Sequence, residues 1–250
     1  MLTTIAHLKD TPNIGDQVCA PYHYFDFPEL KIKDLRDKSE NLNPKVAIFG
    51  GGAIEPYIKG EDSSIINYKS SNKVLWGIGS SRSGMKKNPP FISDEFSLIG
   101  LREWGREGGE YLPCVSCMSP FFDKYKESRI EREVGVYAHA VKSADFLTSF
   151  DGFDIINNRV DFEQAIRFIA SSEIVVTNSF HGTYWALLLS KKVICIPFSS
   201  KFYGYKFEPN YTSLVDWKKQ LNAKFSLSED YLQESRKINI DFYKKVMNLY

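Results

Sequence analysis

The chain has 250 residues, of which 43% are hydrophobic and 25% are charged, a composition that is ordinary for a folded globular protein. Its 32 basic and 31 acidic residues give a formal net charge of +1, which excludes a strong overall field for nucleic acid but leaves room for a local basic patch. No apolar run approaches the roughly 18 residues of a membrane span, the first ten residues do not resemble a signal peptide, and we therefore expect a cytoplasmic protein.

Short apolar runs that end in glycine or small polar residues predict two series of buried strands. The runs lie at 45–54, 73–81 and 97–105, and then at 133–140, 153–158, 173–178 and 192–197. Helix-compatible segments separate them, which is typical of parallel sheets covered on both faces. The sequence therefore predicts an α/β fold.

Two helices and one connection complete this outline. Residues 161–171 carry apolar side chains at helical spacing, with Asp161 and Gln164 placed as a capping box, and residues 228–250 are also helical in pattern. Residues 122–133 carry many charges of both signs and no apolar run, so we interpret them as a surface connection. We expect domains at 1–125 and 126–250 with a ligand cleft between them, since open α/β sheets bind ligands at the carboxyl ends of their strands.

Glycines follow the first two predicted strands. Gly51 and Gly52 lie in "FGGGAI", and Gly79 precedes Ser80 in "WGIGSS". Such glycines either form a tight turn or let a ligand approach the backbone, and both interpretations stay open. A dinucleotide site is poorly supported, because the full glycine spacing and the acidic residue about 20 positions further on are missing.

The stretch "TNSFHG" places a polar loop between a strand and a helix that we expect to begin near Thr183. Ser179, His181 and the backbone N–H groups of such a helix converge on an anion. His181 can donate a proton near neutral pH once that anion is bound, although an ordinary capping or loop histidine is the alternative. As an exposed cleft side chain, it should contribute only about 0.5 kcal/mol to stability.

Other polar side chains lie at further strand ends. Lys201, Arg102 and His139 each follow an apolar run, and each is also compatible with an ordinary surface position. The early "NIGDQ" cluster is turn chemistry that can also present Asp16 as a base. Since parallel strands end at one edge of a sheet, we expect these groups to lie near one another.

The cysteines do not indicate a metal site. Cys114 and Cys117 form the one close pair, and Cys19 and Cys195 lie elsewhere in the sequence. A structural zinc site usually needs four ligands, and no second pair stands at a suitable spacing. We interpret Cys114 and Cys117 as two reduced core or loop thiols of a cytosolic protein and expect no metal.

The motifs "NIGDQ", "FGGGAI", "WGIGSS", "LREWG", "YLPCVSCMSPFFD", "GVYAHA" and "TNSFHGTYWALLLSKKVICIPFSSK", taken in order, resemble the polysaccharide pyruvyltransferase family. The resemblance runs from about Asn13 to Lys201. It implies two Rossmann-like domains facing across a cleft, as in the glycosyltransferase-B class. It also implies that residues 1–125 form the acceptor side and residues 126–250 the donor side.

The implied activity is transfer of pyruvate from phosphoenolpyruvate to a sugar as a cyclic ketal. The acceptor would be a bacterial surface polysaccharide or its lipid-linked precursor, with transient contact at the inner membrane face, and no cofactor is implied. The resemblance implies catalytic roles for His181 and Asp16. The implied donor-binding residues are Ser179, Gly182, Lys201 and Arg102, and the further cleft candidates are Asn13, Gly15, Gly51, Gly52, Gly79, Ser80 and His139.

Two departures from the family pattern keep rival functions open. Ser179 stands where many members have an arginine, and Glu103 follows Arg102 where aspartate is usual. The first departure favours a glycosyltransferase of the same architecture that uses a nucleotide-sugar donor. A non-catalytic module that binds sugars or anions is the second rival.

Overall fold

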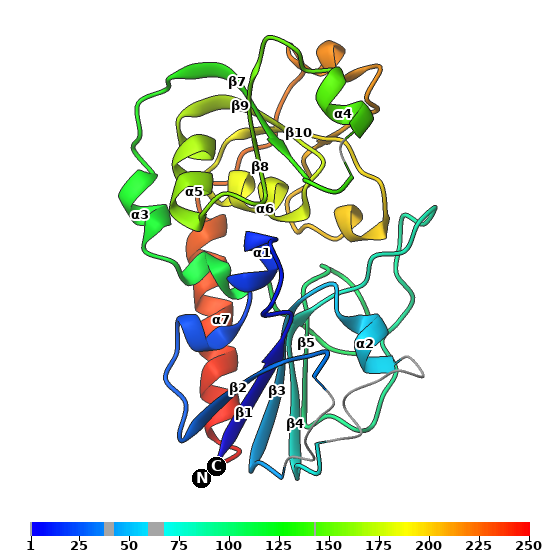
Figure 1. The fold of residues 1–250 in the computed structure, drawn as a ribbon, viewed down its shortest axis with the longest axis vertical. Helices are drawn as coiled ribbons and strands as arrows, with labels where there is room; N and C mark the ends of the chain where they lie inside the picture. Colours follow the sequence, from blue (N-terminus) through cyan, green and yellow to red (C-terminus); the bar gives the residue numbers. More distant parts are fainter. Residues whose placement is uncertain (1, 38–42, 60–67, 143) are drawn as a thin grey trace.

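The computed structural model describes residues 2–37, 43–59, 68–142 and 144–250, and two parallel sheets form its framework (Figure 1). The strands of the first sheet are β1 (Thr3–His7), β2 (Leu30–Asp34), β3 (Val46–Gly52), β4 (Asn72–Ile78), β5 (Leu98–Leu101) and β6 (Glu110–Tyr111). Their order is β2-β1-β3-β4-β5-β6, and every neighbouring pair is parallel. In the register of this sheet, Ile5 pairs with both Ile32 and Ile48.

The second sheet has the order β11-β10-β9-β7-β8 and is also parallel throughout. Its strands are β7 (Arg132–Ala138), β8 (Asp154–Asn157), β9 (Ser172–Thr177), β10 (Lys192–Cys195) and β11 (Asn210–Tyr211). Each of the seven predicted runs contains a strand, so the α/β prediction with two series of parallel strands is confirmed. The sequence analysis missed β1, β2 and the two-residue strands β6 and β11.

The helices of the described residues cover the faces and edges of these sheets. They are α1 (Ile14–Gln17), α2 (Glu55–Lys59), α3 (Phe121–Tyr125), α4 (Ala144–Thr148), α5 (Phe162–Ala170), α6 (Phe180–Leu188) and α7 (Tyr231–Met247). The predicted helix at 161–171 is α5, and the side chain of Asp161 caps it by accepting a hydrogen bond from the Gln164 amide at 2.8 Å. Within the described ranges, no helix combines the length and the apolar character that a membrane crossing requires.

The segment 122–133 is more than a surface connection. Helix α3 occupies its beginning, and Phe122 is fully buried in the core beneath α5 and α6. This helix was not predicted because it is short and only its three aromatic side chains mark it, next to charged residues.

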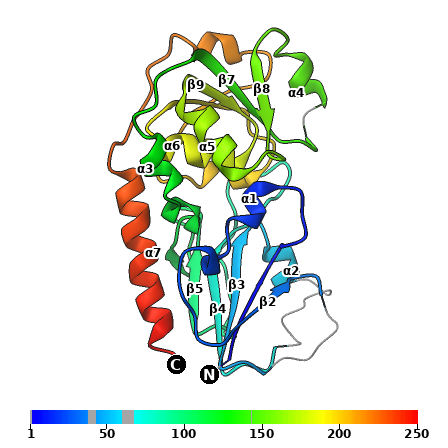
Figure 2. The same cartoon turned by 60° about the vertical axis from the view of Figure 1, so that its left-hand side comes forward.

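Helix α7 returns the end of the chain to the first sheet (Figures 1 and 2). Phe242 and Val246 are buried in one apolar cluster with Ile5, Ile48 and Trp76. The indole nitrogen of Trp76 also donates a hydrogen bond to the Asn239 side-chain oxygen at 3.0 Å. The division at residue 125 stays a prediction, but the core of the first sheet includes residues from the last part of the chain.

Helix α1 joins the carboxyl ends of the two sheets. It follows β1, and its N-cap residue Asn13 accepts a hydrogen bond from the Asn158 side chain at 2.9 Å. The Ile14 amide donates to the Asn158 carbonyl at 2.9 Å. Because Asn158 directly follows β8, these bonds fix α1 against the second sheet and place Asp16, which belongs to α1, between the two halves.

Candidate active site

A cavity of about 220 Å³ lies where the strands of both sheets end. Every side chain in its wall follows the carboxyl end of a strand. The wall includes seven residues that the sequence analysis singled out, namely Asn13, Asp16, Arg102, His139, Ser179, His181 and Lys201. Tyr57 and Ser81, which the sequence analysis did not single out, also line it.

The glycines expected in the cleft lie behind the wall. Gly51 and Gly52 adopt positive φ angles of 64° and 81°, and a Cβ on Gly51 would lie 2.2 Å from the carbonyl oxygen of Cys19. A Cβ on Gly182 would lie 2.5 Å from the Tyr137 ring, so this glycine faces the second sheet rather than a ligand. Gly51 and Gly182 need glycine because protein atoms approach closely, and Gly52 needs it because of its positive φ angle.

Gly79 and Ser80 have a similar supporting role. A Cβ on Gly79 would lie 2.5 Å from the Nε of Arg102, and the Ser80 amide donates to the carboxylate of Glu103 at 2.8 Å. Glu103 also accepts from Asn88 at 3.2 Å and from Arg106 at 3.3 Å. Glutamate at position 103 therefore holds the loop that carries Arg102 and does not enter the cavity wall.

Helix α6 begins at Phe180, not near Thr183 as predicted from the sequence. Ser179 is its N-cap, and its hydroxyl accepts a hydrogen bond from the Gly182 amide at 3.3 Å. His181 therefore belongs to the first turn of the helix. The positive end of α6 still points at the cavity, because both Ser179 and Phe180 line it.

His181 is buried, which corrects the expectation of an exposed cleft side chain. Only 5% of the residue is exposed. Its ring centroid lies 5.3 Å from those of Phe180 and Trp185, and a Cβ on Gly15 would lie 2.0 Å from its Nδ1 atom. Gly15, a cleft candidate from the sequence, therefore lets α1 pack directly on the His181 ring.

A chain of polar contacts leads from Trp185 through Ser116 and Cys114 to His181. The indole N–H of Trp185 donates to the Ser116 hydroxyl at 3.0 Å, and that hydroxyl lies 3.2 Å from the thiol of Cys114. The thiol in turn lies 3.6 Å from the Nε2 atom of His181. Indole nitrogen can only donate, so each group in the chain can donate to the next. A neutral His181 with Nε2 as acceptor then keeps its proton on Nδ1.

Cys114 therefore contacts the candidate acid, a role that the sequence analysis missed. The only available signal was the close spacing of Cys114 and Cys117, which does not reveal a partner 67 positions away. All four cysteines are buried free thiols, and for Cys114 and Cys117 this agrees with the interpretation from the sequence. Burial is the main cause that raises the pKa of the Cys114 thiol, which favours the protonated, hydrogen-bonding form.

The environment holds His181 neutral when the cavity is empty. Burial is the main cause that lowers its pKa well below the ordinary value, and the charges of Arg102 and Lys201 add to the effect. The negative charge of a bound anion would raise the pKa of His181 and so oppose these three effects. His181 can therefore gain a proton when an anionic ligand enters.

Arg102 brings a cation into the cavity directly after β5. Its guanidinium carbon lies 3.8 Å from the centre of the Phe180 ring, and the residue is only 4% exposed. Its Nε atom is buried and has no hydrogen-bond partner in the described part of the chain. A buried donor of this kind is costly unless a ligand satisfies it.

Lys201 and Asp16 face the same space with opposite charges. Burial and then the charge of Arg102 lower the pKa of Lys201 to about 8, while Asp16 opposes this shift. Burial raises the pKa of Asp16, against the pull of Arg102 and Lys201 and a hydrogen bond of 2.7 Å from the Asn13 amide group. Both side chains can therefore exchange protons closer to neutral pH than is usual for their type.

His139 completes the wall beside Lys201. Its Nδ1 atom accepts a hydrogen bond from the Val141 amide at 3.3 Å, and its ring packs edge-on against Phe198 with 5.7 Å between centroids. Burial, followed by the charge of Lys201, lowers the pKa of His139 to about 4. It is therefore neutral at physiological pH.

This arrangement can bind a small anion and move protons next to it. Two cations and a helix N-terminus converge on one small cavity, together with two imidazoles and a carboxyl group. Among the described residues, no three His, Cys, Asp or Glu side chains are arranged to hold a metal ion.

Comparison with protein-family models found that residues 116–200 match polysaccharide pyruvyl transferase. The resemblance to this family is confirmed. The match includes Ser179 and His181 and ends immediately before Lys201, so the matched segment supplies much of the second-sheet side of the cavity. The activity that the family description names is a transferase activity.

The other comparisons add little. A search of curated proteins gave no match. An uncharacterized protein from Klebsiella pneumoniae subsp. pneumoniae NTUH-K2044, whose crystal structure has been solved, is similar at 18% sequence identity. That similarity covers 78% of this chain and 83% of the other, with a TM-score of 0.48.

Replacing Gly15 with alanine should disable the site without unfolding the sheets. The new Cβ would overlap His181 Nδ1, so either α1 or the imidazole ring must move. Even a shift of about 1 Å can lower the rate of a reaction about 100-fold. Circular dichroism and transfer activity, measured on the same sample, check this expectation.

Gln17→Ala is the matched control on the same short helix. The Gln17 side chain donates to the Thr11 carbonyl and does not line the cavity. An activity loss as large in the control as in Gly15→Ala would show that α1 acts through its general stability and not through its contact with His181.

Proposed function

We propose that the protein transfers pyruvate from phosphoenolpyruvate to two hydroxyl groups of a sugar, forming a cyclic ketal. The sugar would belong to a bacterial surface polysaccharide or its lipid-linked precursor, with transient contact at the inner membrane face. The meeting of Arg102, Lys201 and the start of α6 in the wall of one small cavity is the observation that carries the proposal. Phosphoenolpyruvate offers a phosphate and a carboxylate to these groups.

The proposed reaction requires one acid and one base. C3 of phosphoenolpyruvate takes a proton, the first sugar hydroxyl adds to C2, and the bond from C2 to the phosphate oxygen breaks. The second hydroxyl then adds to C2. One of the two hydroxyl protons is balanced by the proton on C3, and the other leaves with the phosphate.

His181 and Asp16 have the properties that these steps need. The negative charges of the bound donor raise the pKa of His181, so that it acquires the proton that C3 requires. Asp16, held by Asn13, accepts a proton from the sugar hydroxyl. Arg102 and Lys201 stabilise the phosphate as it leaves. Ser179 caps α6, and the guanidinium of Arg102 lies over the Phe180 ring at the start of the same helix.

A thermal-shift experiment tests the donor. Phosphoenolpyruvate at 100 times its dissociation constant should stabilise the protein by about 2.7 kcal/mol, which raises the melting temperature by roughly 5–10 °C. Lys201→Ala should lose most of this shift. A shift with UDP-, GDP- or CMP-sugars and none with phosphoenolpyruvate would favour the nucleotide-sugar glycosyltransferase instead.

The pKa of Lys201 adds a pH signature to the same experiment. Phosphoenolpyruvate should bind the charged lysine, so its affinity should fall as the pH rises above about 8. The stability of the unliganded protein should instead rise with pH over this range. Between this pKa and the ordinary value of 10.5, the unfolded chain binds more protons at Lys201 than the folded protein does. Lys201→Arg keeps its positive charge and should show neither trend. If the affinity of this variant for phosphoenolpyruvate falls with pH as it does in the parent protein, the pH effect belongs to another group.

A further inference from the structure

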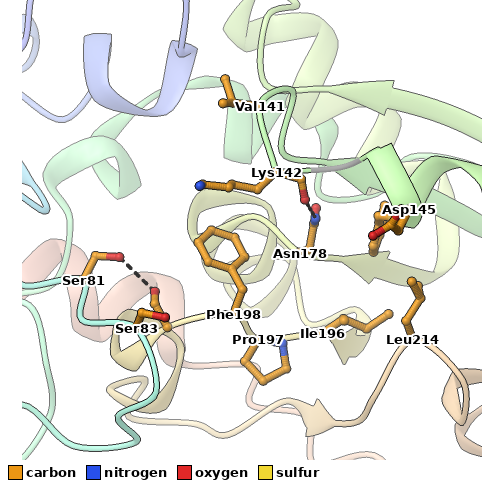
Figure 3. A pocket seen from close by; sticks show the side chains of 12 residues that line it. Ser81, Ser83, Val141, Lys142, Asp145, Asn178, Ile196, Pro197, Phe198 and Leu214 are labelled. Atoms are coloured by element: carbon orange, nitrogen blue, oxygen red, sulfur yellow. Dashed lines mark hydrogen bonds between the residues drawn. The ribbon is translucent and has the colours of Figure 1, made fainter.

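A second and larger cavity lies beside the first. Its volume is about 630 Å³, within the roughly 300–1,000 Å³ typical of small-molecule sites. Figure 3 shows the Phe198 side chain in the wall of this cavity, between Ser81 and Asn178, which also line it. Most of the wall follows strands β7, β9 and β10 of the second sheet.

The two cavities share a wall. Ser81 lines both of them. The ring of Phe198 lines the larger one, while the ammonium group of Lys201 lies 4.6 Å from its centre and His139 packs against its edge. Since Lys201 and His139 line the smaller cavity, a ligand on Phe198 would lie next to a donor bound there.

The wall of the larger cavity combines an aromatic face with hydroxyl groups. Phe198 is accompanied by the apolar side chains of Ile196 and Leu214. The hydroxyls of Ser81 and Ser199 lie 2.8 Å apart at one side, where Figure 3 draws the bond from Ser81 as a dashed line. A ligand that fits this wall has an apolar face and a rim of hydrogen-bonding groups, as a pyranose ring has.

Charge distinguishes the two cavities. The larger one has one lysine, Lys142, and one aspartate, Asp145, so its charged side chains cancel. The smaller one has Arg102 and Lys201 against the single carboxyl group of Asp16. The phosphates of a nucleoside diphosphate would meet only one cationic side chain in the larger cavity. The equal numbers of positive and negative side chains there favour an uncharged ligand.

Hydrogen bonds between loops fix the shape of the larger cavity before any ligand binds. The Asn178 side chain donates to the Lys142 carbonyl and accepts from the His139 amide, both at 2.8 Å. Across the cavity, the Arg82 amide donates to the Ser200 hydroxyl at 2.8 Å, and the Ser200 amide donates to the Arg82 carbonyl at 2.9 Å. A preformed wall reduces the entropy cost of binding.

We propose that the larger cavity binds the acceptor as an uncharged pyranose, with one sugar face on the Phe198 ring. This inference rests on the proposed function and assigns its second substrate to a specific site. The reacting hydroxyls would pass Ser81 and Phe198 to reach a donor in the smaller cavity. The side of the cavity lined by Val141, which is 69% exposed, faces solvent, so the rest of the glycan can extend outward there. The second sheet thus provides most of the acceptor site, in contrast to the expectation for residues 1–125.

Saturation-transfer NMR with simple methyl glycosides tests this site. The probes are the methyl glycosides of galactose, glucose, mannose and N-acetylglucosamine, with UDP-glucose as a separate arm. At least one glycoside should receive saturation from the parent protein. Leu214→Trp, which fills the cavity from the loop after β11, should weaken that binding about tenfold, and Phe198→Leu should weaken it about three- to tenfold.

Two controls separate this inference from the proposed function. Leu227→Trp adds the same side chain at a position that is 52% exposed and outside the cavity, and it should leave glycoside binding unchanged. The thermal shift with phosphoenolpyruvate should survive in Leu214→Trp, because Leu214 does not line the smaller cavity. If phosphoenolpyruvate causes no thermal shift in the parent protein, that result counts against the proposed function and not against a sugar site.

Three results would overturn the sugar site. They are the absence of saturation transfer to every glycoside, full glycoside binding in both Leu214→Trp and Phe198→Leu, and binding of UDP-glucose alone with its loss in Leu214→Trp. The last would make the cavity a nucleotide site. If Leu214→Trp does not fold, Phe198→Leu carries the test, since a leucine keeps the apolar contact with neighbouring side chains but not the ring face.

Discussion

His181→Ala should abolish transfer and also lower the free energy of unfolding by about 2–4 kcal/mol. Alanine removes a ring that packs against Phe180, Trp185 and Gly15, and it leaves the Cys114 thiol without its partner. Loss of the acid should stop transfer because C3 of the donor is no longer protonated. Urea unfolding and phosphate release, measured below the melting temperature of the variant, check both parts.

Two further variants separate the structural and chemical roles of His181. His181→Gln keeps more of the side-chain volume but cannot act as the acid, so it should lose transfer with a smaller loss of stability. His23→Ala removes a more exposed histidine, whose Nε2 atom lies 2.9 Å from the Gln17 carbonyl oxygen, and should lower the stability by only about 1 kcal/mol. Transfer that persists in His181→Gln would assign the proton to another group.

Arg102→Met should eliminate the thermal shift caused by phosphoenolpyruvate while leaving the unliganded protein at least as stable as the parent. The guanidinium is buried with an unpartnered Nε, and it adds to the positive charge around Lys201. A methionine can fill much of the same space against Phe180 without an unsatisfied donor. Loss of a buried charged contact to the donor should weaken binding by about 2–5 kcal/mol, or roughly 30- to 4,000-fold.

Arg106→Met is the matched control, because Arg106 is also buried but is fully paired. It contacts Glu55 at 2.7 Å and Glu103 at 3.3 Å, and breaking these pairs should cost about 3–5 kcal/mol. Calorimetry of both variants, with and without phosphoenolpyruvate, makes the comparison. A clear destabilisation in Arg102→Met would mean that this arginine supports the fold, and an intact donor shift would remove it from the binding site.

The sequence predicts the central strands well because they are continuous apolar runs. Strands β3, β4, β7 and β9 are buried on both faces, and their patterns are hard to mistake. Strand β1 was missed because its two threonines interrupt the apolar pattern, although both are fully buried in the structure. Strand β2 was missed because it alternates between lysines and apolar residues.

The gathering of polar side chains at the carboxyl ends of the strands could also be predicted from the sequence. Arg102, His139 and Lys201 each follow an apolar run, and parallel sheets place such positions along one edge. What the sequence does not indicate is how deeply these groups are buried. The burial of His181 depends on Gly15 and Cys114, which lie far from it in the sequence, and the sequence alone does not identify such contacts.

The return of α7 to the first sheet has a consequence for how the protein folds during its synthesis. Trp76 and Asn239, which are hydrogen bonded across this contact, are separated by 163 positions. At about 5–20 residues per second, a ribosome needs roughly 8–33 s to make the chain between them. During that interval the apolar face of the nascent first sheet, with Ile5, Ile48 and Trp76, has no helix to cover it. We therefore expect the newly made first sheet to depend on chaperones until α7 leaves the ribosome.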